Sequence, residues 1–196
     1  MSSGGHQGGT CFRSLFTFIV TGGFVVLIYW AIFQPHHIHA TVASAELTNL
    51  TVTNGTSHGA VSYTLAVRLN LYNPSLRVNI YYDTLDCELR LRGAWLGHAN
   101  GTSPAEFYQR RKSSDEVKLE FAGTDVAVPG DAAADLEKDK RKGSVSLEVA
   151  VDARVRYRFS SIKIRQKPRI WCSLTILVRA DGGGRLDSGD RCSVKY

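Results

Sequence analysis

The strongest pattern along the chain is an apolar run close to its N-terminus. Residues Leu15 to Phe33 read LFTFIVTGGFVVLIYWAIF and include no charged residue. A helix of this length extends about 28 Å, close to the bilayer hydrocarbon thickness of about 30 Å. The run therefore predicts a single transmembrane helix over residues 15–33, with a short tail over residues 1–14 and a juxtamembrane linker over residues 34–45.

Two alternatives for this run, a cleaved signal peptide and an uncleaved anchor, differ in the length of the run and in the residues behind it. A signal peptide has a shorter apolar region and a small-residue cleavage site close behind. The A-x-A pattern here, Ala43-Ser44-Ala45, lies well beyond the run, which favours a signal-anchor. Arg13 is the only Lys or Arg before the run and the next one is Arg68, so the positive-inside rule predicts a cytosolic N-terminus and an exoplasmic remainder.

After residue 40 the dominant pattern is an alternation of apolar and polar residues. Residues 85–92 alternate strictly, and residues 145–159 place apolar side chains at odd positions and mostly Ser, Glu, Asp or Arg at even ones. This period of two is typical of half-buried strands. Shorter strand candidates are Thr41–Val52, Ala60–Leu71, Val117–Phe121, Ile170–Val178 and Cys192–Lys195.

Turn residues separate these candidates and decide the fold class. Asn54-Gly55, Asn73-Pro74, Pro129-Gly130 and Gly182-Gly183-Gly184 each mark a turn, and only residues 132–142 have a helical pattern. About seven antiparallel strands with little helix predict an all-β domain, an antiparallel β-sandwich over residues 46–196.

Three N-x-[ST] sequons support the exoplasmic placement of this domain. Asn49, Asn54 and Asn100 are the candidate N-glycosylation sites, whereas the proline after Asn73 excludes a fourth.

The four cysteines have different predicted roles. Cys172 and Cys192 lie on neighbouring strand candidates joined by the glycine turn, so we expect a disulfide between them. Cys87 lies on the apolar face of its strand and is expected to be a buried free thiol. Cys11, four residues before the apolar run, is a candidate for acylation or a bystander thiol.

Charge adds one feature to this picture. The chain has 24 Lys or Arg against 18 Asp or Glu, and no acidic residue occurs between Asp152 and Asp181. A one-signed strand face gains from an approaching anionic surface, which outside a cell means acidic wall polysaccharide or lipid head groups. The alternative is a solvated face whose arginines protect a sheet edge. The candidate basic face consists of Arg154, Arg156, Arg158, Lys163 and Arg165.

Candidate chemistry is sparse. The cluster His36-His37-x-His39 has no nearby carboxylate or cysteine to complete a metal site. The sequence has no G-x-S-x-G elbow, no P-loop and no aromatic-basic platform for nucleic acid. We therefore expect no catalytic residues, no metal and no cofactor, and neither an enzyme nor a nucleic-acid-binding protein.

One segment resembles a known family. Residues 73–83, NPSLRVNIYYD, resemble the signature "NP-x-x-R-x-x-x-x-YD" of plant non-race-specific disease resistance/harpin-induced-like (NHL) proteins, which carry a late embryogenesis abundant group 2 (LEA_2) domain. Phe107-Tyr108-Gln109, Cys172 and Cys192 follow in the family order. Gln34 stands where the family has Arg, and the family's cysteine cluster is reduced to Cys11.

The resemblance implies an immunoglobulin/fibronectin III-like sandwich in a non-enzymatic plasma-membrane protein of plant defence, including the hypersensitive response. Its expected roles are contact with the cell wall or membrane, or assembly with immune receptor or adaptor proteins, with plasmodesmata as a further location. The alternative is a lipid-binding or stress-protective module that holds an apolar ligand between its sheets. The motif residues carried over are Asn73, Pro74, Arg77, Tyr82 and Asp83.

The motif can also be interpreted from its residues alone. Asn73-Pro74 favours a turn, residues 80–82 resume a strand, and Asp83 can cap the next turn. The segment is then either a structural corner of the sandwich or a recognition loop.

Overall fold

The computed structural model describes residues 7–33, 38–53, 58–179, 181–187 and 192–196. The chain divides into two compact units, residues 1–36 and residues 37–196, and each is described by itself.

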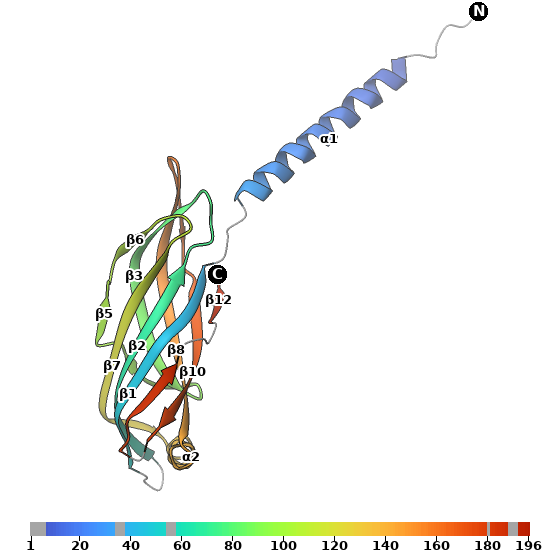
Figure 1. Ribbon diagram of the computed structural model, residues 1–196. Helices are drawn as coiled ribbons and strands as arrows, with labels where there is room; N and C mark the ends of the chain where they lie inside the picture. The colour runs from blue at the N-terminus through green and yellow to red at the C-terminus, as the bar shows by residue number, and fades with distance from the viewer. Residues whose placement is uncertain (1–6, 34–37, 54–57, 180, 188–191) are drawn as a thin grey trace, which may run out of the picture. The chain divides into compact units, whose positions relative to one another are not determined.

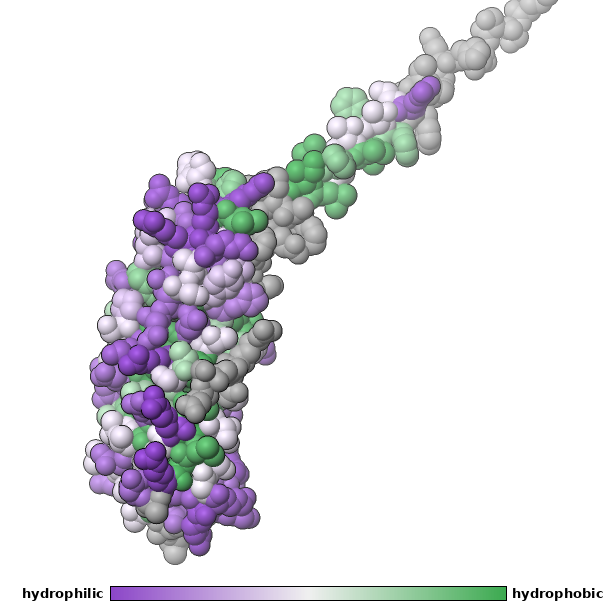
Figure 2. All heavy atoms as spheres, in the orientation of Figure 1, coloured by the Kyte–Doolittle hydropathy of each residue, from purple (hydrophilic) through white to green (hydrophobic). Residues whose placement is uncertain are grey.

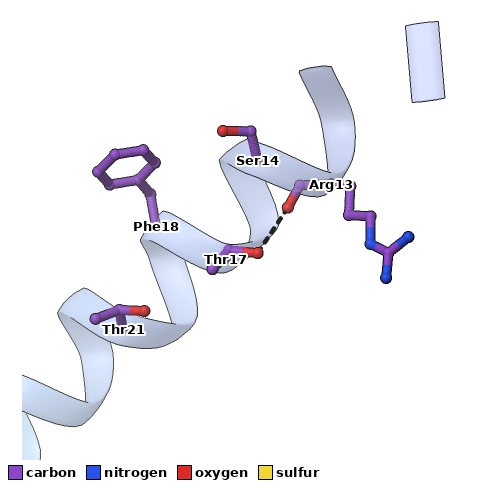
Figure 3. A pocket seen from close by; sticks show the side chains of 5 residues that line it. All are labelled: Arg13, Ser14, Thr17, Phe18 and Thr21. Carbon is purple, nitrogen blue, oxygen red and sulfur yellow. Dashed lines mark hydrogen bonds between the residues drawn. The ribbon is translucent and has the colours of Figure 1, made fainter. Parts of the chain in front are cut away.

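The first unit contains one helix, α1, over Gln7–Phe33. In the described part of the chain, no helix combines the length and the apolar character that crossing a membrane requires. The transmembrane helix predicted over residues 15–33 is therefore wrong. That prediction rested on the length of the uncharged run and on its match to the thickness of a bilayer. Polar side chains occur along α1 at Arg13, Ser14, Thr17 and Thr21 (Figure 3).

The second unit is built on one antiparallel sheet of 12 described strands (Figure 1). Four strands form one half: β1 (His39–Thr53), β2 (His58–Tyr72), β7 (Ser114–Pro129) and β5 (Gly101–Ser103). The other half consists of β3 (Asn79–Leu91), β4 (Ala94–His98), β6 (Phe107–Gln109), β8 (Ser144–Phe159), β9 (Ile162–Gln166), β10 (Arg169–Val178) and β12 (Ser193–Lys195). The short β11 (Gly184–Asp187) pairs with both β1 and β10 and so joins the two halves.

The two halves face each other across a single core. Buried side chains alternate along β2 from Val61 to Leu71 and along β8 from Val145 to Tyr157, and both series belong to one hydrophobic cluster. Apolar residues at every second position form strands here because the core covers only one face of each strand. The all-β, antiparallel part of the fold prediction is confirmed.

The start of the sheet differs from the predicted boundary. β1 begins at His39, whose backbone lies opposite Tyr72, so residues 39–45 belong to the sheet and not to the predicted linker 34–45. Ile38, Ala40 and Val42 are buried. His39 and Thr41 alternate with these buried residues, so β1 begins two residues before the strand candidate Thr41–Val52.

A second helix, α2 (Gly130–Arg141), packs on the sheet. It buries Ala133 and Leu136, and its outer carboxylates Asp135 and Asp139 form ion pairs with Arg92. The helix predicted over residues 132–142 is confirmed.

Candidate functional site

The motif at residues 73–83 forms a hydrogen-bonded corner between β2 and β3. The side chain of Asn73, which is fully buried, donates from Nδ2 to the carbonyl oxygens of Val78 (2.9 Å) and Arg110 (3.1 Å). Its Oδ1 accepts from the backbone N–H of Ser75 at 3.0 Å. Because one amide joins its own loop to the loop after β6, the corner is held in a defined shape, as the structural interpretation requires.

Tyr82 and Gln109 extend this network into the core. The Tyr82 hydroxyl donates to Gln109 Oε1 at 3.2 Å, and Gln109 Nε2 donates to the carbonyl oxygen of Leu71 at 2.7 Å. Burial raises the pKa of the Tyr82 hydroxyl. The phenol therefore stays neutral, and this part of the motif has a packing role rather than an acid–base role.

Asp83 does not cap a turn. It lies at an irregularity of β3, between Tyr82 and Thr84, where the register with β8 shifts. Its carboxylate binds the guanidinium of Arg156 on β8, with Nε 2.8 Å from both oxygens and Nη2 2.5 Å from Oδ1. These hydrogen bonds and the carboxylate charge raise the pKa of Arg156. Arg156 also lies over the Tyr81 ring, which packs against Tyr108 with 4.4 Å between centroids.

The residues of the predicted basic face lie on β8 and β9, where Arg156 is bound to Asp83, and anion binding by this face stays a prediction. In the β8–β9 hairpin, Arg156 lies opposite Arg165 and Arg158 lies opposite Lys163, so like charges face each other across the strands. Arg154, Arg158, Lys163 and Arg165 are exposed, and the structure shows no ion pair for them among the described residues. A hollow of about 180 Å³ lies between Tyr81, Arg156, Arg158 and Lys163.

A second hollow adjoins the other end of this face. Its lining includes Arg154 and Lys167 together with Asp86 and Asp152. Asp152 is already bound by Arg169, with Nε 2.5 Å from Oδ1. The linings of these two hollows are mostly polar or charged, so they give no support to the alternative of an apolar ligand held between the sheets.

The cysteines have distinct positions. Cys172 on β10 and Cys192, just before β12, are joined in a disulfide. Cys87 is a buried free thiol whose pKa burial raises to about 12, so it is not a reactive thiolate. The side chain of Cys11 lies outside the described residues, and its acylation stays a prediction.

The three sequons also differ. Asn49 is exposed in an irregular part of β1 with φ 57°, and Asn100 is exposed while its Oδ1 accepts from the N–H of Ala122. Asn54 lies outside the described residues. Glycosylation at all three positions stays a prediction.

Neither a metal site nor a converging catalytic set is found in the described parts. No group of three or more metal-ligating side chains occurs among these residues, while His36 and His37 of the predicted cluster lie outside them. A hollow of about 420 Å³ beside α1 is lined by residues of that one helix, and Figure 3 shows these side chains spread along it. Thr17 there donates only to the carbonyl oxygen of Arg13, at 2.9 Å.

Comparison with known proteins gives the family. Residues 68–174, more than half of the chain, match the family LEA_2, described as late embryogenesis abundant protein. The chain belongs to the LEA_2 family. This LEA_2 match includes the whole corner motif, Gln109 and Arg156.

The relatives of this LEA_2 protein are plant proteins. NDR1/HIN1-like protein 3 of Arabidopsis thaliana is 29% identical, over an alignment that spans 94% of this chain and 79% of the relative. NDR1/HIN1-like protein 2 is 32% identical, over 74% of this chain and 59% of its own length, and NDR1/HIN1-like protein 10 is 27% identical, over 86% and 75%. The resemblance to NHL proteins is thereby confirmed, and a role in plant defence or stress fits this kinship.

A crystal structure of a protein from Archaeoglobus fulgidus covers 68% of this chain and 98% of its own. Its 9% identity and TM-score of 0.30 are too low to support an argument.

Sequence reasoning missed two features of this region. It named Phe107-Tyr108-Gln109 only as a landmark, although Gln109 is the buried partner of Tyr82. It also passed over the exposed apolar side chains Leu76, Ile162 and Ile164. The signal for the second was available, because isoleucines alternate with basic residues at 162–165 with the period of two that is typical of a strand.

Proposed function

We propose that this LEA_2 protein is a non-enzymatic binding module of plant defence or stress responses, and that its basic face binds a polyanion. In this proposal it acts at the plasma membrane or the adjoining cell wall, where acidic polysaccharide and anionic lipid head groups are within reach. The names of its NDR1/HIN1-like relatives support the biological setting.

The observation that carries the proposal is the like-charged register of the β8–β9 hairpin. Arg158 opposite Lys163 and Arg156 opposite Arg165 place cations side by side, and like charges in facing positions destabilise a hairpin. The carboxylate of Asp83 offsets one of these charges. An anionic ligand would offset the others, which are exposed and have no carboxylate bound among the described residues.

The test is binding to polygalacturonate, a soluble polyanion, measured by affinity electrophoresis over a range of salt concentrations. Replacing Arg154, Arg158, Lys163 and Arg165 with Gln should weaken binding at least about tenfold at low ionic strength and flatten its salt dependence. The control replaces four other exposed cations with Gln, Lys118, Lys138, Arg141 and Lys142, which changes net charge equally. Equal loss in both variants would contradict a specific face.

Binding to immune receptors or adaptor proteins, which the resemblance also implies, stays a prediction.

A further inference from the structure

The tip of the β8–β9 hairpin exposes apolar side chains that a free surface would not favour. Ile162 and Ile164 are 45% and 44% exposed. Ile164 lies opposite Tyr157 and Ile162 lies opposite Phe159, so both isoleucines continue the core-facing side of β8 beyond the buried Tyr157. The arginines and Lys163 occupy the other side. The hairpin tip is therefore amphipathic, with a basic face and an apolar face.

The corner loop adds a third apolar side chain at the same end. Asn79 at the start of β3 lies opposite Arg158, so the loop that precedes it leaves the sheet beside the hairpin. Leu76 in this loop is 68% exposed, although Asn73 fixes the loop by three side-chain hydrogen bonds. Leu76 is thus held outward by a rigid corner.

Basic residues accompany these apolar side chains. The loop after β6 carries Arg110, Arg111 and Lys112, all exposed, and is attached to the corner by the hydrogen bond from the N–H of Lys112 to the carbonyl oxygen of Ser75. We call residues 74–78, 110–112 and 158–165 together the docking end. They include seven Lys or Arg and no Asp or Glu. The hairpin and both loops lie at one end of the unit in Figure 1, where Figure 2 shows hydrophilic side chains with apolar ones between them.

We propose that the docking end binds peripherally to an anionic lipid bilayer, with Leu76, Ile162 and Ile164 entering the interface and the surrounding cations contacting lipid head groups. This inference rests on the proposed function, because it names one polyanion for the same face. Exposed apolar side chains among basic ones are typical of interfacial binding, in which burial and attraction to anionic lipid act together.

The charge and the exposed apolar side chains of the docking end favour a lipid bilayer over a soluble acidic polymer and over a second copy of this chain. A soluble acidic polymer would use the cations and leave the apolar side chains in water. A second copy of this chain, docked through the same end, would bring the two sets of seven cations together. A bilayer with anionic lipids satisfies both the apolar and the cationic groups.

The test places an environment-sensitive fluorophore at the tip of the full-length chain. Ser161→Cys, combined with Cys11→Ser, carries the label between Phe159 and Ile162. Ser146→Cys, combined with the same Cys11→Ser change, carries the control label at an exposed position on β8 beyond the docking end. Both labelled chains are mixed with vesicles of phosphatidylcholine and phosphatidylserine in equal amounts, and with phosphatidylcholine alone. Lipid contact made elsewhere in the chain contributes to both labels, so only the difference between them is interpreted.

We expect a blue shift and gain of emission at position 161 with the anionic vesicles, absent at position 146 and weaker with phosphatidylcholine alone. Replacing Ile162 and Ile164 with Ser should reduce this response and leave polygalacturonate binding and the melting temperature unchanged. No response at position 161, or an equal one at position 146, would overturn the inference. If polygalacturonate binding persists in that case, the proposed function stands without it, and if that binding is also absent, both fail.

Discussion

The guanidinium of Arg156 binds the carboxylate of Asp83 through both carboxylate oxygens, across two neighbouring strands. The contact joins Asp83, the last residue of the corner motif, to Arg156, the middle one of the three arginines that β8 contributes to the basic face. The three arginines at 154, 156 and 158 are therefore not equivalent: Arg156 stabilises the register of β3 on β8, and Arg154 and Arg158 remain available to a ligand.

Removal of either partner of this pair should lower the melting temperature. We expect Asp83→Asn and Arg156→Gln to lower it by similar amounts, and the double variant by little more than either, because each single change already removes the same interaction. A double-mutant cycle by thermal unfolding measures this coupling. Arg154→Gln is the control, since its side chain forms no ion pair with the described residues. Additive effects of the two changes would show that the pair is not coupled.

Asn73 is the residue whose loss should most affect the corner. Asn73→Ala removes three hydrogen bonds of a buried side chain and leaves two backbone carbonyls and one backbone N–H without this partner, so we expect unfolding to become easier by about 2–3 kcal/mol. Denaturation with urea, followed by tryptophan fluorescence, gives this difference.

Asn70→Ala is the matched control for Asn73, because Asn70 is half-buried near the end of β2, just before the corner, and forms no side-chain hydrogen bond within the described part of the chain. It should change stability by less than about 0.5 kcal/mol. An equal effect of both variants would mean that the corner bonds contribute nothing specific.

The strands were predictable because the core covers one face of each strand, which places an apolar residue at every second position of the sequence. Residues 85–92 and 145–159 show that period, and β3 and β8 account for nearly all of both ranges. The helix at α2 was predictable as well, since residues 132–142 interrupt the alternation. β11 was not, because Gly184 to Asp187 is too short and too polar to show a period.

The contacts of the site were less accessible to sequence reasoning. Asn73 binds the carbonyl of Arg110, and Tyr82 binds Gln109, at separations of 37 and 27 residues. No local pattern reports such a contact, because it depends on which distant strands pair and which loops meet in the folded chain.

The disulfide should contribute to stability by restricting the unfolded chain. Cys172 and Cys192 are separated by 20 residues, for which loop-closure entropy predicts about 3 kcal/mol. Cys172→Ser should therefore lower the melting temperature in non-reducing buffer and bring it close to that of the reduced parent protein. Calorimetry with and without reductant tests this. If Cys172→Ser remains sensitive to reductant to the same extent as the parent, the bond does not contribute in this way.

Stability should fall in alkaline solution. Burial raises the pKa of Cys87 to about 12 from 9.0 and raises the pKa values of Tyr82 and Tyr157 above 10.0. The folded state keeps these protons while the unfolded state releases them, so the stabilisation is complete below pH 9 and is lost as pH rises toward the folded-state values. The slope should reach about 1.4 kcal/mol per pH unit for each group involved. Urea midpoints between pH 8 and pH 11 measure it.

Two variants assign the alkaline loss to its groups. In a plot of the urea midpoint against pH, Cys87→Ala should reduce the fall that begins near pH 9. Tyr82→Phe should reduce the fall above pH 10. Each variant removes one titrating group. Tyr108→Phe, at an exposed tyrosine for comparison, should leave the profile unchanged. An unchanged slope in both core variants would show that other groups control the loss.

Gly59 should tolerate a small side chain poorly. A Cβ atom there would lie 2.2 Å from Cβ of Ala133 and 3.2 Å from the carbonyl oxygen of Thr53, so α2 approaches β2 this closely only because residue 59 has no side chain. Gly59→Ala should displace α2 and destabilise the domain by about 1–3 kcal/mol. Gly101→Ala is the control, since the nearest atom to its added Cβ would be 3.6 Å away, an ordinary contact. Urea unfolding of both variants compares the two strand glycines directly. A Gly59→Ala protein as stable as Gly101→Ala would mean that α2 can shift at little cost, and that its packing on β2 does not fix this end of the sheet.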